Sequence, residues 1–156
     1  MAIYVVRHAK AGDRAEWEGD DRLRPLTKAG FRQAAELAAW LKKEPIDAIL
    51  SSPYVRCLQT LEPLAEQRKL PIQPRPDLEE GSGGESILRL VDEFKGRNVV
   101  LCTHGDLVEE LLEHLIDQGL VPRARAQLDK GSTWILEEKN GRITGATYRS
   151  APGGHA

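Results

Sequence analysis

Three short apolar runs constrain the fold of this chain more than any other feature. They occupy residues 3–6, 46–50 and 98–103, are rich in Val, Ile and Leu, and are each followed by a segment with helical periodicity. Such runs are typical of buried strands, and strands that alternate with amphipathic helices predict a sheet covered on both faces. We therefore expect an α/β protein, a three-layer α/β/α sandwich around a central, mostly parallel sheet.

The helical segments carry recognisable start and stop signals. Thr27 is a predicted N-cap, and Phe31 belongs to the apolar face of the helix that follows it. Pro53 suits the first turn of a second helix, which Pro63 is expected to kink or shorten. The first two strand-like runs are thus each followed by a helix.

The second half of the chain continues this alternation and then changes character. Residues 71–75 contain prolines, which favour an edge strand, and helical patterns follow at residues 87–94 and from about Gly105. Asn140 and Gly141 separate two strand-like runs and indicate a two-residue hairpin. We expect this hairpin to form an antiparallel edge of the sheet.

Length and composition indicate one domain without an extended charged surface. We expect residues 1–150 to form that domain and residues 151–156 to be a flexible tail. A net charge of −2 with scattered charges argues against binding to nucleic acid or to a membrane. Cys57 and Cys102 have no CxxC spacing and are predicted to be buried, which fits a reducing cytoplasm. The sequence shows no leader and no apolar span, so a cytoplasmic protein is expected. The sequence leaves the oligomeric state open.

Two of the apolar runs lead directly into histidine. Arg7 and His8 follow the first run, and His104 and Gly105 follow the third, where a helix is expected to begin. If these strands are parallel neighbours, both imidazoles meet at one carboxyl edge, beside the free amides of a helix start. Such an edge favours an anion.

The middle run adds hydroxyls and a second arginine to the same edge. Ser51 and Ser52 follow the run, and Arg56 lies in the first turn of the next helix. Arginine binds phosphate through paired hydrogen bonds, and histidine is a nucleophile near neutral pH. Ser52 has two open uses, a hydrogen bond to a phosphate oxygen or a cap for the helix.

In their order and spacing, these motifs resemble the histidine phosphatase superfamily, which is related to the cofactor-dependent phosphoglycerate mutases. The motifs are Arg7-His8, Ser51-Ser52-Pro-x-x-Arg56-x-x-Gln59-Thr60 and Thr103-His104-Gly105. Arg24-Pro25-Leu26-Thr27 is similar to the compact, SixA-like phosphohistidine phosphatase branch. Residues 7–12 also resemble the phosphatase-like domain that is fused to some Nudix hydrolases, although no Nudix motif occurs in this sequence.

The resemblance implies a role for each matched residue. His8 would accept the phosphoryl group, while Arg7, Arg56 and His104 hold its oxygens, with Gly105 and Ser52 counted among the substrate-binding residues. Water would then hydrolyse the phosphohistidine. The scheme requires no metal and no other cofactor.

The proton donor for the leaving group is less sharply indicated. Glu80 is favoured because it stands two residues after Leu78, as in the mutase-like pattern. Glu79 and Glu85 are alternatives, and so is an acidic loop that simply faces water.

The main functional interpretation is a phosphatase for phosphohistidine on a protein. The alternatives are a phosphatase of small phosphate esters or nucleotides, and a module that binds phosphate without turnover. A serine hydrolase using Ser51 or Ser52 with His104 and Asp106 is disfavoured because no Gly-x-Ser-x-Gly elbow is present. A metal site is disfavoured because no His-x-His or HExxH spacing occurs.

Overall fold

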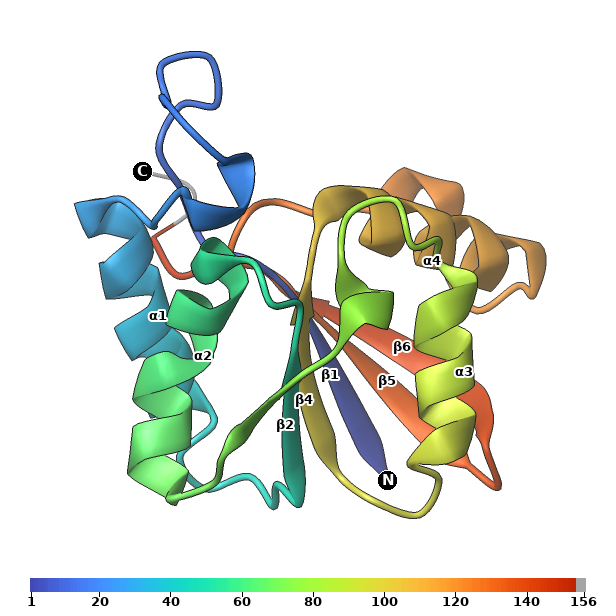
Figure 1. Ribbon diagram of the computed structural model, residues 1–156. Helices are drawn as coiled ribbons and strands as arrows, with labels where there is room; N and C mark the ends of the chain where they lie inside the picture. Colours follow the sequence, from blue (N-terminus) through green and yellow to red (C-terminus); the bar gives the residue numbers. More distant parts are fainter. Residues whose placement is uncertain (154–156) are drawn as a thin grey trace.

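A computed structural model describes residues 1–153 and shows a six-stranded mixed sheet between two layers of helices (Figure 1). The strands are β1 (Ala2–Arg7), β2 (Ala48–Ser51), β3 (Ile72–Pro74), β4 (Val99–Thr103), β5 (Thr133–Lys139) and β6 (Arg142–Arg149). Their order is β3-β2-β4-β1-β5-β6; the first four are parallel, whereas β5 is antiparallel to both β1 and β6. The predicted parallel sheet with an antiparallel edge hairpin is confirmed.

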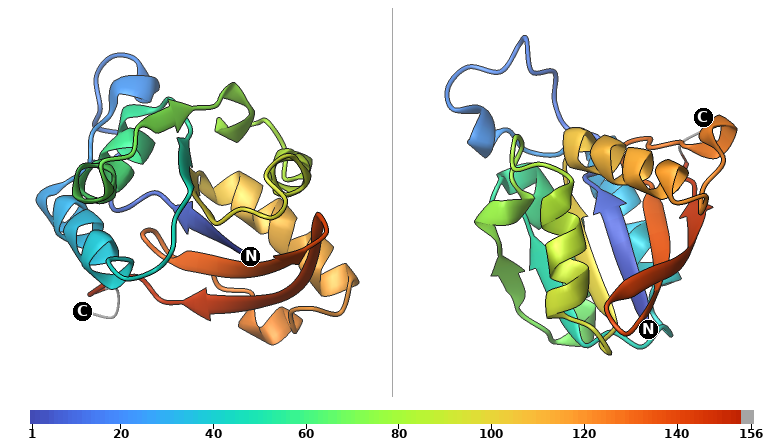
Figure 2. Two further views of the ribbon diagram at one scale, coloured as in Figure 1. Left: turned by 90° about the horizontal axis from the view of Figure 1, so that it is seen from below. Right: turned by 90° about the vertical axis from the view of Figure 1, so that its right-hand side faces the viewer.

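In the part of the chain that the structure describes, four helices cover the two faces of the sheet. Helices α1 (Lys28–Trp40) and α2 (Val55–Arg68) lie on one face, and α3 (Glu85–Glu93) and α4 (Gly105–Asp117) lie on the other (Figures 1 and 2). The short 3-10 helices η1 (Asp21–Leu23), η2 (Pro76–Leu78) and η3 (Arg123–Arg125) lie in the connections. The predicted three-layer architecture is thus confirmed. Within residues 1–153, no helix has the length and hydropathy needed to cross a membrane.

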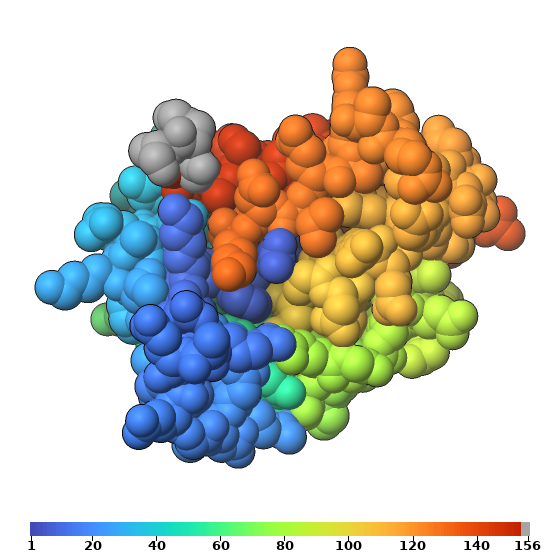
Figure 3. All heavy atoms as spheres, turned by 90° about the horizontal axis from the view of Figure 1, so that it is seen from above, coloured from blue at the N-terminus to red at the C-terminus, as the bar shows by residue number. Residues whose placement is uncertain are grey.

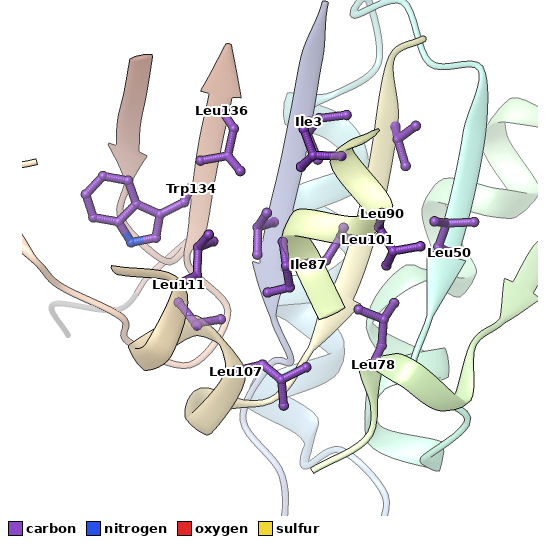
Figure 4. Packing of buried hydrophobic residues seen from close by; sticks show 14 of the residues in the cluster. Ile3, Leu50, Leu78, Ile87, Leu90, Leu101, Leu107, Leu111, Trp134 and Leu136 are labelled. Carbon is purple, nitrogen blue, oxygen red and sulfur yellow. The ribbon is translucent and has the colours of Figure 1, made fainter. Parts of the chain in front are cut away.

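The alternation of side chains along each strand builds two separate cores. In β1, Ile3 and Val5 face the α3 and α4 layer, whereas Tyr4 and Val6 face the α1 and α2 layer, and all four are buried. Figure 4 shows the first core, in which side chains of the sheet pack against those of α3 and α4; among them are Ile3, Leu50, Leu101, Ile87, Leu90, Leu107 and Leu111. Because both faces are buried, the parallel strands read as continuous apolar runs in the sequence.

Details of the first two helices differ from the sequence-based expectations. Thr27 is the N-cap of α1, as predicted, but Phe31 is exposed because it lies on the solvent side of the helix. Helix α2 begins at Val55, so Pro53 precedes it. The helix also continues through Pro63 to Arg68, because packing of the fully buried Leu61 and Leu64 compensates for the missing backbone donor.

The C-terminal part closes the sheet with a tight turn. Asn140 and Gly141 both have positive φ, which is the backbone geometry of the predicted two-residue hairpin. Beyond residue 150 the chain still contacts the domain: Ala151 is buried, and the carbonyl of Pro152 accepts a hydrogen bond from Gln33. The rest of the predicted tail, residues 154–156, lies outside the described residues.

Candidate active site

The carboxyl ends of β1, β4 and β2 meet at one edge of the sheet, as the sequence predicts. Arg7 lies opposite Thr103 and Ser51 lies opposite Cys102, so the residues that follow these strands emerge side by side. The rings of His8 and His104 are 5.5 Å apart, centroid to centroid. In the view from above, the N-terminal segment (blue) and the segment after α4 (orange) surround this edge (Figure 3).

His8 is held as a neutral imidazole with one nitrogen available. Its Nδ1 lies 2.8 Å from the carbonyl oxygen of Ala9, to which its N–H donates a hydrogen bond. Burial, with a smaller contribution from the charges of nearby His104, Arg56 and Arg7, lowers the pKa of His8 to about 3. Since Nδ1 carries the proton, Nε2 presents the lone pair, which is the form a nucleophile needs.

The backbone around His8 is tied to two other elements. The amide of His8 donates to the carbonyl of Thr103, and the amide of Ala9 donates to Thr60 Oγ1 at 3.0 Å. The Thr60 hydroxyl in turn donates to the carbonyl of Arg56 at 2.7 Å. Thr60 therefore sets the start of α2 against the end of β1.

Arg56 is fully buried beneath the site and carries several interactions. Its Nη2 donates to Glu80 at 2.7 Å and to Asp21 Oδ2 at 3.1 Å, and its Nη1 donates to the backbone carbonyl of Asp21. The guanidinium also lies over the ring of Tyr54, 4.9 Å from its centroid. These contacts hold the guanidinium in place before any substrate binds.

Arg7 enters the site from the end of β1. Its Nη1 donates to the carbonyl of Leu128 at 2.6 Å, while its buried Nε has no hydrogen-bond partner among the described residues. Gly105 makes this position possible, because a Cβ there would lie 2.7 Å from Arg7 Nη2. Gly105 thus contributes to the site by leaving room for a guanidinium.

His104 is oriented from behind by Ser52. The Ser52 hydroxyl lies 2.9 Å from His104 Nε2, and Cys57 Sγ lies 3.6 Å from the same nitrogen. Buried Nδ1 has no hydrogen bond with the described residues and faces Glu80 at 3.4 Å. Ser52 does not line the pocket; its Oγ accepts from the amide of Tyr54, the N-cap of α2, at 3.3 Å, but no side-chain hydrogen bond caps the helix itself. Both sequence-based uses of Ser52 differ from this placement, because the strand end aims its hydroxyl at His104.

Of the three candidate acids, Glu80 alone lines the pocket. Its Oε1 accepts from Arg56 and from Arg14, at 2.7 and 2.8 Å. Glu79 pairs instead with Arg22 outside the pocket, and the Glu85 side chain is 88% exposed on α3. The carboxylate of Glu80 therefore occupies the anion-binding side of Arg56.

The pocket has a volume of about 630 Å³ and contains cations that sequence reasoning did not assign to the site. Arg14, the buried Arg24 and Lys130 line it together with Arg7 and His8. Asp21, which pairs with Arg24 and Arg56, was also missed. Arg24 lies in the Arg-Pro-Leu-Thr motif, which was a usable signal, whereas no pattern marks Lys130. Among residues 1–153, no group of three or more His, Cys, Asp or Glu side chains is arranged to hold a metal.

Comparison with known proteins agrees with this geometry. Residues 3–87 match the model of the histidine phosphatase superfamily (branch 1). The chain is 37% identical to the 8-oxo-(d)GTP phosphatase of Mycolicibacterium smegmatis over 96% of its own length and 48% of that protein. It is 38% identical to phosphohistidine phosphatase SixA of Escherichia coli over 46% of its length and 44% of that protein. The chain thus spans about half the length of these two curated relatives.

A solved structure supports the same assignment at the level of the fold. The protein histidine phosphatase SixA complexed with tungstate superposes with a TM-score of 0.76, covering 97% of this chain and 96% of that chain at 24% identity. The family model itself covers more than half of this sequence, including β1, β2, α2 and the His8 and Arg56 motifs. The chain belongs to the histidine phosphatase superfamily, branch 1.

Proposed function

We propose that this chain is a phosphatase that works through a phosphohistidine on His8 and acts on small phosphorylated molecules of the nucleotide class. The observation that carries the proposal is the state of His8: a neutral ring whose Nδ1 donates to Ala9, with Nε2 available for attack. Arg7, Arg56 and His104 surround it with donors. Phosphoryl transfer depends mainly on such positioning and on electrostatic stabilisation.

The proposed reaction has two displacements at phosphorus. In the first, His8 Nε2 forms a bond to phosphorus while the bond to the leaving oxygen breaks, and that oxygen takes a proton from a protonated Glu80 or from water. In the second, water attacks phosphorus, the P–N bond breaks, and the proton of the water passes to the Glu80 carboxylate or to solvent. Inorganic phosphate then leaves, and His8 returns to its neutral form.

Glu80 competes with the substrate for Arg56. Its Oε1 lies 2.7 Å from Arg56 Nη2 and 3.4 Å from His104 Nδ1, so it takes a place that a phosphoryl oxygen needs. The phosphoryl group must therefore displace the carboxylate before transfer. Substrates whose leaving group needs little protonation suit this arrangement best.

Two observations bear on the substrate. The similarity to a mycobacterial 8-oxo-(d)GTP phosphatase extends over 96% of this chain and supports a nucleotide substrate. Phosphohistidine on a protein is the second candidate, because imidazole is a leaving group that depends little on an acid and Glu80 is held by Arg56 and Arg14.

The test is turnover by the wild type, His8→Ala and His114→Ala in the presence of a chelator. The panel contains an activated aryl phosphate, nucleoside mono-, di- and triphosphates, and a protein carrying phosphohistidine. His8→Ala should lose about a thousandfold or more in rate, because it removes the nucleophile. His114→Ala, at an exposed position on α4, should retain full activity.

The pattern of rates also separates the candidates. An acid-labile, alkali-stable phosphoryl adduct on the wild type, absent from His8→Ala, supports the intermediate. Phosphate binding without turnover of any panel member would instead indicate a recognition module, and preferred turnover of the phosphoprotein would favour the second candidate.

A further inference from the structure

The pocket is lined by more cationic side chains than the binding of a single phosphoryl group requires. Arg7 and Arg56 are placed around His8, yet Arg14, Arg24 and Lys130 also belong to this part of the molecule, and all three line the pocket. Arg14 holds Glu80, whereas the proposed chemistry at His8 assigns no task to Arg24 or Lys130.

A tight turn holds Lys130 beside the nucleophile. The amide of Ser132 donates to the carbonyl of Asp129 at 2.9 Å, and Gly131 has a φ of +84°, a value that favours glycine. The amide of Gly131 also donates to the carbonyls of Arg7 and His8, at 3.0 and 2.9 Å. The turn is therefore anchored directly to the backbone that carries His8, next to the N-terminal segment seen in Figure 3.

The ammonium group of Lys130 has neither a hydrogen bond nor an ion pair with any residue of the described part of the chain. Burial lowers the pKa of Lys130, and the charges of Arg7, Arg24, Arg14 and Arg56 lower it further. A cation that faces other cations without a counter-ion is stabilised when an anion binds between them.

Arg24 offers a second fixed donor in the same pocket. The residue is buried, its Nε donates to Asp21 at 2.8 Å, and its Nη1 donates to the carbonyl of Gly12. Its remaining terminal nitrogen, Nη2, makes no hydrogen bond with residues 1–153. The guanidinium is thus rigidly held while one of its donor nitrogens remains available.

The carboxylates of the pocket already have partners. Asp13 accepts from the amide of Ala15 at 2.9 Å, and Asp106 accepts from the amide of Gly81 at 2.8 Å. Glu80 pairs with Arg56 and Arg14. Among the described residues, none of these three acids forms an ion pair with Lys130 or Arg24, and Arg24 pairs only with Asp21, through its Nε.

We propose that Arg24 and Lys130, with Arg14 at the rim, form a subsite for a second phosphate group that adjoins the one transferred to His8. The inference rests on the proposed phosphatase function and names its substrate class: di- and triphosphate esters, of which the terminal phosphoryl group is removed. The bond that breaks joins the terminal phosphorus to the bridging oxygen, and the electron pair stays on the shorter phosphate ester that leaves. Such a leaving group needs little protonation, which fits the engagement of Glu80 by two arginines.

The experiment compares inorganic phosphate with methylenediphosphonate, a non-hydrolysable diphosphate probe, by calorimetry. Wild type should bind the diphosphonate at least tenfold more tightly than phosphate. Lys130→Met should lose about tenfold in affinity for the diphosphonate and keep its affinity for phosphate within about twofold. Lys10→Met is the matched control, since it removes a cation two residues from His8 that does not line the pocket; it should preserve the preference.

The outcomes distinguish the subsite from the proposed function. If the wild type binds the two probes equally tightly, the subsite proposal is wrong. The same holds if Lys130→Met loses affinity equally for both probes, or if Lys10→Met loses as much affinity for the diphosphonate as Lys130→Met does. A phosphorylated acidic peptide that binds more tightly than the diphosphonate would also overturn it in favour of a protein substrate. Because binding is measured without turnover, failure of aryl phosphate hydrolysis by the wild type would count against the phosphatase function alone.

Discussion

One carboxylate oxygen of Glu80 lies close to three cationic or ionisable side chains of the site. Glu80 Oε1 lies within hydrogen-bond distance of Arg56 and Arg14 and is 3.4 Å from His104 Nδ1. A cation such as Arg56, with no exposed side-chain surface, is costly without an anion nearby. The carboxylate therefore offsets the cost of burying this cation, and under the proposed function a phosphoryl group has to replace it.

Replacing this carboxylate should strengthen the binding of oxyanions. We expect Glu80→Gln to bind inorganic phosphate about fivefold more tightly, because a neutral amide competes less well for Arg56. The same variant should hydrolyse alkyl phosphates about a hundredfold more slowly, since these need a proton donor, while activated aryl phosphates change less. Product inhibition and turnover of the two ester types measure both effects.

Glu79→Gln provides the control for net charge. It removes the same charge one residue away, where the carboxylate pairs with Arg22 outside the pocket. If both variants bind phosphate equally tightly, the effect comes from overall charge, and specific competition at Arg56 is ruled out.

At the level of elements, the site depends on how closely α1 approaches the segment after β1. Gly30 lies in the first turn of α1, and a Cβ there would lie 2.0 Å from the carbonyl oxygen of Lys10. The Thr27 hydroxyl donates to the same carbonyl, and its amide does as well. The start of this helix therefore positions the loop that begins at His8.

We expect Gly30→Ala to destabilise the protein, although alanine is normally favoured over glycine inside a helix. In an unconstrained helix, alanine is about 1 kcal/mol more favourable than glycine. Here we expect the substitution to lower the free energy of unfolding by about 2–3 kcal/mol, because the methyl group must displace backbone at Lys10. Denaturant unfolding and aryl phosphate turnover should both show the change.

Ala35→Gly is the comparison within the same helix. Ala35 is exposed, so this variant should cost only about 1 kcal/mol and leave activity intact. A stabilised Gly30→Ala protein with normal turnover would show that α1 does not set the geometry of the loop.

At the level of the whole molecule, a group of buried polar residues lies at the carboxyl edge of the sheet, next to the two apolar cores. His8, Arg56 and His104 are at most 5% exposed, and they lie against the cores formed by the helix layers. A histidine buried in its neutral form links the stability of the entire domain to pH. The folded chain takes up a proton on His8 only near its lowered pKa of about 3, whereas the ordinary value is 6.5.

This difference predicts how stability changes with pH. Between about pH 6.5 and pH 3 the unfolded chain binds a proton at His8 that the folded chain does not, so acid favours unfolding in that range. Wild type should lose about 2 kcal/mol of unfolding free energy from this group between pH 7 and pH 5. His8→Asn should lack this pH-dependent loss of unfolding free energy. His114→Asn, at an exposed position, should show the same loss as the wild type. Urea unfolding at the two pH values measures the difference; identical pH dependence of wild type and His8→Asn would contradict it.

The layers of the sandwich, and the residues that meet at the carboxyl edge, follow from the sequence alone. Both follow from local physics: strands buried on two faces are continuously apolar, and parallel neighbours end at a common edge. This logic identified Arg7, His8, Arg56 and His104, whose convergence the sheet register produces.

Tertiary contacts, in contrast, set which further charges enter the pocket, which group Ser52 contacts, and which glutamate reaches Arg56. Ser52 is aimed at His104, Glu80 rather than Glu79 reaches Arg56, and Lys130 reaches the pocket from a turn more than a hundred residues after His8. The reason is physical: periodicity reports which residues face a core, whereas loop side chains are placed by turns and long-range hydrogen bonds that leave no periodic pattern.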